Sequence, residues 1–385
     1  EAQDRLVATH GKPSRGTGVR FAAPRQAPSL RDGRHLATAW RIPYATTARV
    51  GKGERSVTDS GTVVCAGILV ADHVCTPMRA LPAAGCLAAV DAIYLLVGGC
   101  AANVAVDVAK QEIPVRVVGR VGDDLWGRFL RDSLADRGVD TRWIRTAPGY
   151  QTSQTLVLLC EGEDRRFVHC FGANRAVTAA DFDAEALAGA RVFYLGGYLV
   201  LPGVRPDELA AVFRHGRERG SATVLDVVVP DGFEYRGELE PVLPYTDFFL
   251  PNTDEARLLT GFADPVEQLR ALDRLGARHT LITLGGDGVV FSEGGRCFAA
   301  SAYPVQVLDA TGAGDAFAAG IIAGIVQGYS LADCIRYGSA LGSSCVRALG
   351  CSDGVFTAAE ARAFLRDHPL PIRPLSRDCP AHLGG

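Results

Sequence analysis

The chain has 385 residues, of which 48% are hydrophobic and 22% are charged, with 44 glycines and 20 prolines. This ordinary globular composition excludes a fibrous, collagen-like or wholly disordered chain, and it is enough for one large domain or two small ones. Residues 1–60 hold 11 of the 40 basic and 5 of the 43 acidic side chains, so residues 61–385 carry a net charge of −9, which argues against a body that binds nucleic acid. No run approaches about 18 uninterrupted apolar residues, and the first residues lack the apolar run of a secretory signal, so we expect a cytoplasmic protein that does not associate with membranes.

Residues 1–60 mix Arg, Gly, Pro, Ser and Thr without the periodicity of a helix or a strand. We therefore predict a disordered N-terminal extension over these residues. Its basic character leaves open an organelle-targeting segment or an arm that binds nucleic acid. Because the segment contains no amphipathic helix, a featureless tail or a misplaced translation start is the favoured interpretation.

From residue 61 onward, short apolar runs alternate with amphipathic segments. Several of the apolar runs are continuous, as expected for strands that are covered on both faces. The alternation predicts a parallel sheet with helices on both sides. The predicted strands are 62–70, 114–122, 191–197, 222–229, 246–250 and 280–286, and the predicted helices are 101–110, 124–138, 207–220 and one that begins at 253.

One region breaks this alternation. Within residues 150–174, two strand-like runs flank a tight polar turn, which predicts an antiparallel hairpin. Together with extended stretches after Asp72 and around 91–99, the hairpin predicts a small second sheet, a lid over roughly 71–99 and 152–172. Such a lid covers a site or pairs with a second subunit, so a homodimer through the lid is one expectation. The proline-rich residues 371–385 are predicted to form a loose tail.

The most informative segment is 307–324, where a strand end is followed by Gly312, Ala313 and Gly314 and then by a long apolar helix. Small residues at such a junction let consecutive backbone amides point outward at a helix N-terminus, where an anion such as a phosphoryl group is favoured. Asp315 lies in the first turn of this helix. Taken alone, its carboxylate has a simpler interpretation as a helix cap.

With these residues in view, the sequence resembles the ribokinase or PfkB family of carbohydrate kinases. The family signature Asp-Thr-x-Gly-Ala-Gly-Asp is matched by residues 309–315, with Ala310 in place of threonine. A Gly-Gly pair followed by an asparagine is matched by Gly98, Gly99 and Asn103. The Asn-x-x-Glu element is matched at 252–255 and Thr-Leu-Gly at 283–285, so four elements in the family's order span roughly residues 64–356.

The resemblance implies a ribokinase-like fold over 61–370, a three-layer α/β/α sandwich with a mostly parallel central sheet and a small β-sheet lid. It implies ATP-dependent transfer of a phosphoryl group to the hydroxymethyl group of a small-molecule sugar. A nucleoside kinase of the same fold is an alternative, as is a non-catalytic module that senses a sugar or nucleotide, although a sensor has no need of the intact base and glycines. The sequence has no GxxxxGK[ST] motif, which excludes a P-loop mechanism. After Asp226 it also lacks the Asp-x-Asn-x-Arg pattern of many fructokinase-like and ketodeoxygluconate-kinase-like members, which makes those substrates less expected.

The resemblance also implies roles for individual residues. Asp315 matches the catalytic base, and the amides of Gly312, Ala313 and Gly314 match an anion hole. The residues matched to the sugar site are Asp72, Gly98, Gly99 and Asn103, and those matched to the nucleotide site are Asn252, Thr283, Gly285, Gly314 and Ser339. Asn252 and Glu255 match the Mg²⁺ element, although an N-cap with its capping partner explains the same spacing. A monovalent cation, K⁺, is implied beside the anion hole, held by Asp309 and Thr311 and by a later loop with Cys345, Ala348 and Gly350.

Overall fold

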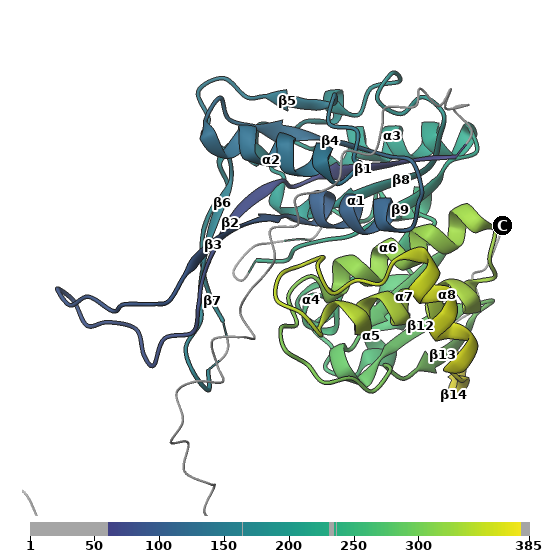
Figure 1. Cartoon of the computed structure of the whole chain (residues 1–385). Helices are drawn as coiled ribbons and strands as arrows, with labels where there is room; N and C mark the ends of the chain where they lie inside the picture. Colours follow the sequence, from purple (N-terminus) through teal and green to yellow (C-terminus); the bar gives the residue numbers. More distant parts are fainter. Residues whose placement is uncertain (1–60, 164, 231–234, 236, 379–385) are drawn as a thin grey trace, which may run out of the picture. The chain divides into compact units, whose positions relative to one another are not determined.

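The computed structural model describes residues 61–163, 165–230, 235 and 237–378, and its largest element is a ten-stranded sheet (Figure 1). The predicted N-terminal extension, residues 1–60, lies outside the described residues. Seven strands are parallel: β5 (Ile144–Thr146), β4 (Val115–Val121), β1 (Thr62–Gly67), β8 (Ala190–Gly196), β9 (Ala222–Leu225), β10 (Phe248–Phe249) and β11 (His279–Thr283). The sheet continues from β11 through three antiparallel strands, β12 (Val289–Glu293), β13 (Arg296–Ala300) and β14 (Ile372–Asp378).

Strand β1 shows why this sheet is covered on both faces. Val63 and Cys65 belong to one buried apolar cluster, and Val64 and Ala66 belong to another, because alternate residues of a strand point to opposite faces. The first cluster includes residues of α1 (Cys100–Lys110), α2 (Leu125–Asp136), α6 (Ala313–Gln327), α7 (Leu331–Cys345) and α8 (Ala358–Asp367). The second includes residues of α3 (Pro206–Glu218), α4 (Thr253–Thr260) and α5 (Pro265–Asp273). The predicted three-layer α/β/α sandwich is therefore confirmed. No helix among the described residues is long and apolar enough to cross a bilayer.

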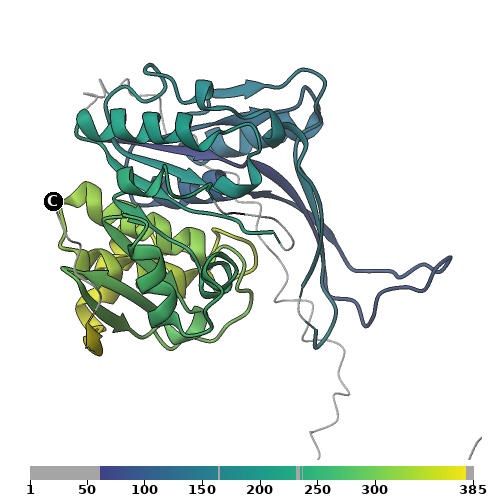
Figure 2. The ribbon, with the colours of Figure 1, turned by 180° about the vertical axis from the view of Figure 1, so that it is seen from behind.

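A separate four-stranded sheet forms the lid. Its strands are β3 (Ile93–Gly98), β2 (Val70–Cys75), β6 (Gln154–Leu158) and β7 (Arg166–Cys170), in that order. Strand β2 begins three residues after β1 ends, so the lid leaves the main sheet at the carboxyl end of a central strand. Figure 1 and Figure 2, from opposite sides, both show these strands standing away from the main sheet. The β6–β7 hairpin was expected from the sequence, and its strands pair antiparallel.

Of the boundaries that differ from the sequence-based prediction, two matter for the fold and the site. The loose tail predicted for 371–385 is wrong for residues 372–378, which form β14 against β13. Pro374 is tolerated there because β14 is the outermost strand and has a neighbouring strand on one side only. Its missing backbone N–H therefore breaks no hydrogen bond to a second strand. The strand predicted over 222–229 ends at Leu225, which leaves Asp226 at the carboxyl edge of the sheet.

Candidate active site

The candidate site lies where several strands and helices meet at the carboxyl edge of the parallel sheet. Asp226 follows β9, α4 follows β10, and α1 begins directly after β3 of the lid. In open parallel sheets this edge is the usual place for a ligand, because loops from neighbouring strands converge on it. The chain order of these elements therefore brings side chains more than 200 residues apart into one space.

Asp315 and Asn103 are joined at the centre of this space. The Asn103 side-chain amide donates to Asp315 Oδ2 at 2.9 Å. Asn103 is 4% exposed, and its Oδ1 has no hydrogen-bond partner among the described residues. Helix α6 begins after Gly312 and has no side-chain cap, so the carboxylate of Asp315 is directed to α1 rather than to the amides of its own helix. The geometry disfavours the helix-cap interpretation of Asp315.

The surroundings of Asp315 make it a better proton acceptor than an exposed carboxylate. Burial raises its pKa, while hydrogen bonds from Asn103 and from the Cys100 thiol act in the opposite direction. A raised pKa means a higher affinity for a proton, which suits a general base. The two hydrogen bonds fix the direction of the carboxylate.

Asp72 reaches the same space from the lid. In the lid sheet it is paired with Leu96 of β3 and Thr155 of β6. Its carboxylate lies against Gly98, where an added Cβ would come within 2.0 Å of Asp72 Oδ2, so a larger residue at this position would displace the carboxylate. Burial raises the pKa of Asp72 to about 6, and the negative charge of Asp315 contributes, while a hydrogen bond with Thr155 opposes the shift. The carboxyl groups of the lid and of α6 are therefore close enough to interact.

Asp226 was noted in the sequence, but its place in the site was missed. A side-chain atom from each of Cys100, Asp226 and Asp315 lies within 4.8 Å of the other two. The Tyr194 hydroxyl donates to Asp226 Oδ2 at 3.0 Å. Burial raises the pKa of Asp226, and the charges of Glu255 and Asp315 add to the shift. The available signal was a charged residue inside an otherwise continuous apolar run, which marked Asp226 without showing what it faces.

The loop before α6 leaves backbone amides available to an anion. Gly312 has φ +79°, and a Cβ there would lie 2.5 Å from the Cys351 carbonyl oxygen, so this position requires glycine. Gly314 is exposed, and a Cβ there would meet no atom within 4 Å. Because no side chain caps α6, its first-turn amides can bind a negatively charged group next to Asp315.

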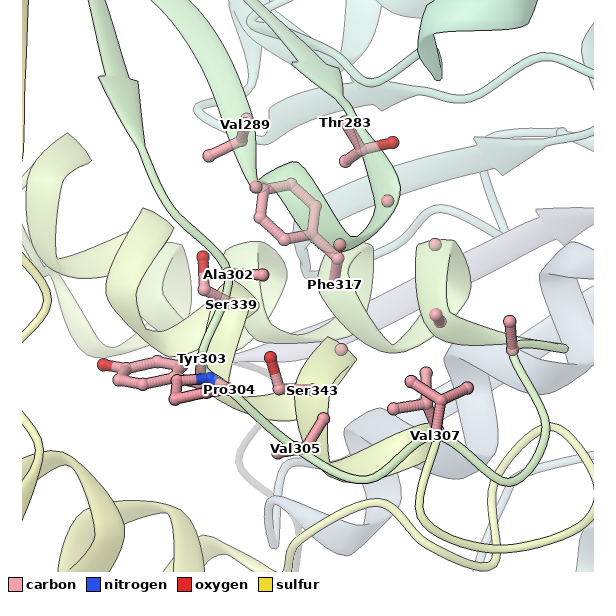
Figure 3. Close-up of a pocket in the computed structure, with 18 residues that line it drawn as sticks. Thr283, Val289, Ala302, Tyr303, Pro304, Val305, Val307, Phe317, Ser339 and Ser343 are labelled. Carbon is pink, nitrogen blue, oxygen red and sulfur yellow. The ribbon is translucent and has the colours of Figure 1, made fainter. Parts of the chain in front are cut away.

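On the other side of this loop is a pocket of about 350 Å³ (Figure 3). It brings together four residues of the predicted nucleotide site: Thr283, Gly285, Gly314 and Ser339. Asn252 is bridged to Thr283 through the backbone, which places it at the margin of the same region. One wall of the pocket could not be expected from the sequence, because the segment that forms it has neither helical nor strand periodicity. This wall consists of Ala302, Tyr303, Pro304, Val305 and Val307.

Asn252 and Glu255 form the capping box that was weighed as an alternative. Asn252 Oδ1 accepts from the Glu255 amide and Glu255 Oε2 accepts from the Asn252 amide, both at 2.9 Å. Burial raises the pKa of Glu255 to about 7, with Asp315 and Asp254 adding to the shift. The pair therefore caps helix α4 in the structure. Glu255 Oε1 takes no part in this cap.

The two loops matched to a monovalent-cation site lie together. Gly350 donates its amide to Asp309 Oδ2 at 3.2 Å, and the Cys345 thiol donates to the Thr311 carbonyl at 3.4 Å. Ala348 is held in the second loop, where its amide donates to the Cys345 carbonyl. A residue that the sequence did not single out is also present: Arg165, from the lid, contacts Asp309 Oδ1 at 3.4 Å and the Thr311 hydroxyl.

These features together define a class of phosphotransferases. A pocket, an uncapped helix N-terminus and a partly buried carboxylate follow one another along the carboxyl edge of a parallel sheet. The sequence model of the pfkB family carbohydrate kinases matches residues 60–358. The chain belongs to the PfkB family of carbohydrate kinases.

Known proteins agree with this assignment. The chain is similar to ribokinase from Arabidopsis thaliana, with 29% identity over 273 residues, which is 66% of this chain and 68% of the relative. It is similar to 2-dehydro-3-deoxygluconokinase from Bacillus subtilis, with 28% identity over 284 residues, 69% of this chain and 86% of the relative. The solved structure of Arabidopsis thaliana ribokinase complexed with ribose and ATP superposes with a TM-score of 0.68 at 27% identity, covering 80% of this chain and 99% of the other. The predicted ribokinase-like fold and the activity of an ATP-dependent sugar kinase are confirmed.

Proposed function

We propose that the chain transfers the γ-phosphoryl group of ATP to the hydroxymethyl group of a neutral sugar, with Asp315 as general base. The observation that carries this proposal is the position of Asp315, which is held by Asn103 beside the uncapped start of α6. The sugar oxygen forms a bond to the γ-phosphorus while its proton passes to Asp315. The bond from that phosphorus to the oxygen it shares with the β-phosphorus breaks, and ADP leaves with the electron pair.

The amides of Gly312, Ala313 and Gly314 are the proposed anion hole. They would stabilise the charge that spreads over the transferred group, because they lie at the start of α6, where the helix carries partial positive charge. The nucleotide would lie in the pocket with Thr283, Gly285 and Ser339. This arrangement places the transferred group between the pocket and Asp315.

The acceptor is proposed to lie between the lid and α6, in contact with Asp72, Asn103 and the backbone of Gly98 and Gly99. Carboxylate oxygens and the unpartnered Asn103 Oδ1 accept hydrogen bonds from sugar hydroxyls. Three carboxyl groups already lie near this space, since the charge of Asp315 contributes to the raised pKa of both Asp72 and Asp226. A carboxylate or phosphate on the acceptor would add a fourth negative charge there, which favours a neutral sugar.

Mg²⁺ fits the residues proposed for it. Asn252 and Glu255 supply the hard oxygen ligands that this cation prefers, because the capping box does not use Glu255 Oε1, and Asn252 Oδ1, the one oxygen of its side chain, keeps a second lone pair. When bound, Mg²⁺ neutralises phosphate charge during transfer. The chain itself contributes the carboxyl group of Glu255 at the start of α4, where the ATP phosphates are proposed to lie.

A panel of acceptors tests the proposed function. ADP release is measured with ATP and Mg²⁺ for neutral pentoses and hexoses, for the corresponding sugar acids and sugar phosphates, and for nucleosides. We expect at least one neutral sugar to be phosphorylated with the highest kcat/KM. A clear preference for a sugar acid or a sugar phosphate would contradict the neutral acceptor, and a preference for a nucleoside would move the chain to the nucleoside-kinase alternative.

A monovalent cation is proposed between the 309–311 loop and the 345–350 loop. Support comes from the two loops lying together, since the Gly350 amide donates to Asp309 Oδ2 and the Cys345 thiol donates to the Thr311 carbonyl. We expect the rate to rise when Na⁺ is replaced by K⁺ at constant ionic strength, because K⁺ is the ion that the family resemblance implies for these loops. Equal rates in Na⁺, in K⁺ and in a large organic cation would count against the site.

A further inference from the structure

Arg165 connects two parts of the molecule that are far apart in the sequence. It lies at the turn between β6 and β7 of the lid, and its guanidinium contacts Asp309 and Thr311, which immediately precede the proposed anion hole. These contacts span 144 and 146 residues of sequence. The side chain is 28% exposed and that of Asp309 is 17% exposed, so the pair is partly shielded from water.

The lid presents this guanidinium in a defined orientation. The central carbon of the guanidinium lies 5.7 Å from the centre of the Phe167 ring. Phe167 belongs to strand β7 of the same hairpin. A cation over an aromatic face is stabilised by the ring quadrupole. Phe167 itself is 56% exposed, so its ring forms a platform at the surface of the lid rather than part of a core.

Asp309 carries a fixed negative charge at an unfavourable place for phosphoryl transfer. Its Oδ1 accepts from the Thr311 amide at 2.9 Å and from the Thr311 hydroxyl at 2.6 Å, and its Oδ2 accepts from Gly350. These bonds fix the position of the carboxylate group against the loop. Negative charge that builds on the transferred group, one turn away at Gly312–Gly314, is repelled by it unless a cation compensates.

We propose that Arg165 is a positioning residue that ties the closed lid to the loop before the anion hole and compensates the charge of Asp309 there. The inference rests on the proposed function. Because the guanidinium belongs to the lid, the compensation exists only when the lid is closed over the acceptor. Arg165 and the monovalent cation therefore act on the same carboxylate, and each lowers the need for the other.

The neighbouring arginine is a matched control. Arg166 pairs with Glu163 of the same hairpin and contacts the Cys160 sulfur, so its bonds stay within the lid. Arg165→Ala and Arg166→Ala remove the same side chain from adjacent lid positions, and Arg165→Lys keeps the charge without the fork of donors.

The kinetic test compares these variants in K⁺ and in Na⁺. We expect Arg165→Ala to lower kcat about 10- to 100-fold, below the loss known for a direct oxyanion donor, with a smaller change in the KM for sugar. The ratio of the rates in K⁺ and Na⁺ rises in this variant, millimolar guanidinium restores part of its rate, and Arg165→Lys keeps most of the activity. Arg166→Ala stays near the wild type. Equal behaviour of the two alanine variants overturns the proposal, as does an Arg165→Ala variant that changes only the KM for sugar.

A measurement without turnover tests the lid contact itself. Hydrogen exchange at the amides of β7 is followed after addition of a non-hydrolysable ATP analogue and, where known, the sugar. Protection of β7 is expected to increase in the wild type and in Arg166→Ala and to stay low in Arg165→Ala. The same protection in all three overturns the contact. An active wild type with no difference between the variants contradicts this inference alone, whereas a wild type that phosphorylates no acceptor contradicts the proposed function and leaves the exchange experiment to decide the role of Arg165.

Discussion

Replacing Asp315 with asparagine is expected to lower kcat about 10²- to 10⁴-fold while the affinity for ATP stays nearly unchanged. Asparagine has the size of aspartate, and it can still bond to Asn103, but it cannot take up the proton of the sugar hydroxyl. The pocket with Thr283 and Ser339 is not altered by the exchange. Steady-state kinetics give kcat, and calorimetry with a non-hydrolysable ATP analogue gives the affinity.

The control for this variant is Asp333→Asn. Asp333 also lies in the first turn of an apolar helix, α7, but it bonds to Ser330 and Arg336 at the surface. Its replacement removes a favourable charge at a helix N-terminus without touching the site, so we expect a small loss of stability and an unchanged kcat. An Asp315→Asn enzyme with full activity would remove the catalytic assignment and return Asp315 to a role in the helix terminus.

Replacing Asp72 with alanine is expected to weaken sugar binding by ~2 to 4 kcal/mol, seen as a large rise in the KM for sugar with little change in the KM for ATP. The variant removes a partly buried charged acceptor and leaves the sugar hydroxyls without their partner. Asp72 lies on the lid against Gly98, on the acceptor side of Asp315 and away from the nucleotide pocket. Kinetics with each substrate varied in turn give the two KM values.

The pH dependence of the KM for sugar is an independent test of the role of Asp72. The pKa of Asp72 is raised to about 6, so in the wild type the carboxyl group becomes protonated as the pH falls through that value and accepts sugar hydroxyls less well. The KM for sugar should rise below about pH 6 in the wild type, and this part of the pH dependence should be absent from Asp72→Ala. Asp91→Ala, which removes an exposed carboxyl group from the same lid, should leave both KM values unchanged. If Asp72→Ala instead raised the KM for ATP and left the KM for sugar unchanged, the proposed positions of sugar and ATP would be wrong.

The layers of the fold and most of its elements were predictable from local patterns. Continuous apolar runs such as the one in β1 occur where a strand is covered on both sides, and amphipathic runs such as the one in α3 occur where a helix covers a sheet. The glycines around α6 were recognisable for a similar reason, since Gly312 adopts a backbone conformation that other residues rarely take. These properties depend on neighbours in sequence, and a pattern along the chain reports them directly.

The contact between Asp315 and Asn103 was predictable from the sequence only in part. Motif order indicated that both serve one site, but the bond between them exists only because α1 and α6 pack against the same face of the sheet. The raised pKa values of Asp72 and Asp226 arise in the same way, from burial and from charges brought close by the fold, and that of Asp315 arises from burial. The residue types predicted which groups take part in the chemistry, and the packing around these groups sets their pKa values.

Other features depended on the tertiary structure alone. Arg165 has no motif around it, and its contact with Asp309 depends on the lid reaching the loop before α6. The pocket wall at 302–307 has no periodicity, and it becomes a wall only because α6 and α7 lie opposite it. The tail strand β14 contains Pro374 and has no strand-like pattern, and the open edge of β13 gives it a partner. In each case the deciding contact joins segments that are distant in sequence, so short-range patterns carry no trace of it, and it is the packing of the whole sheet that brings the two sides together.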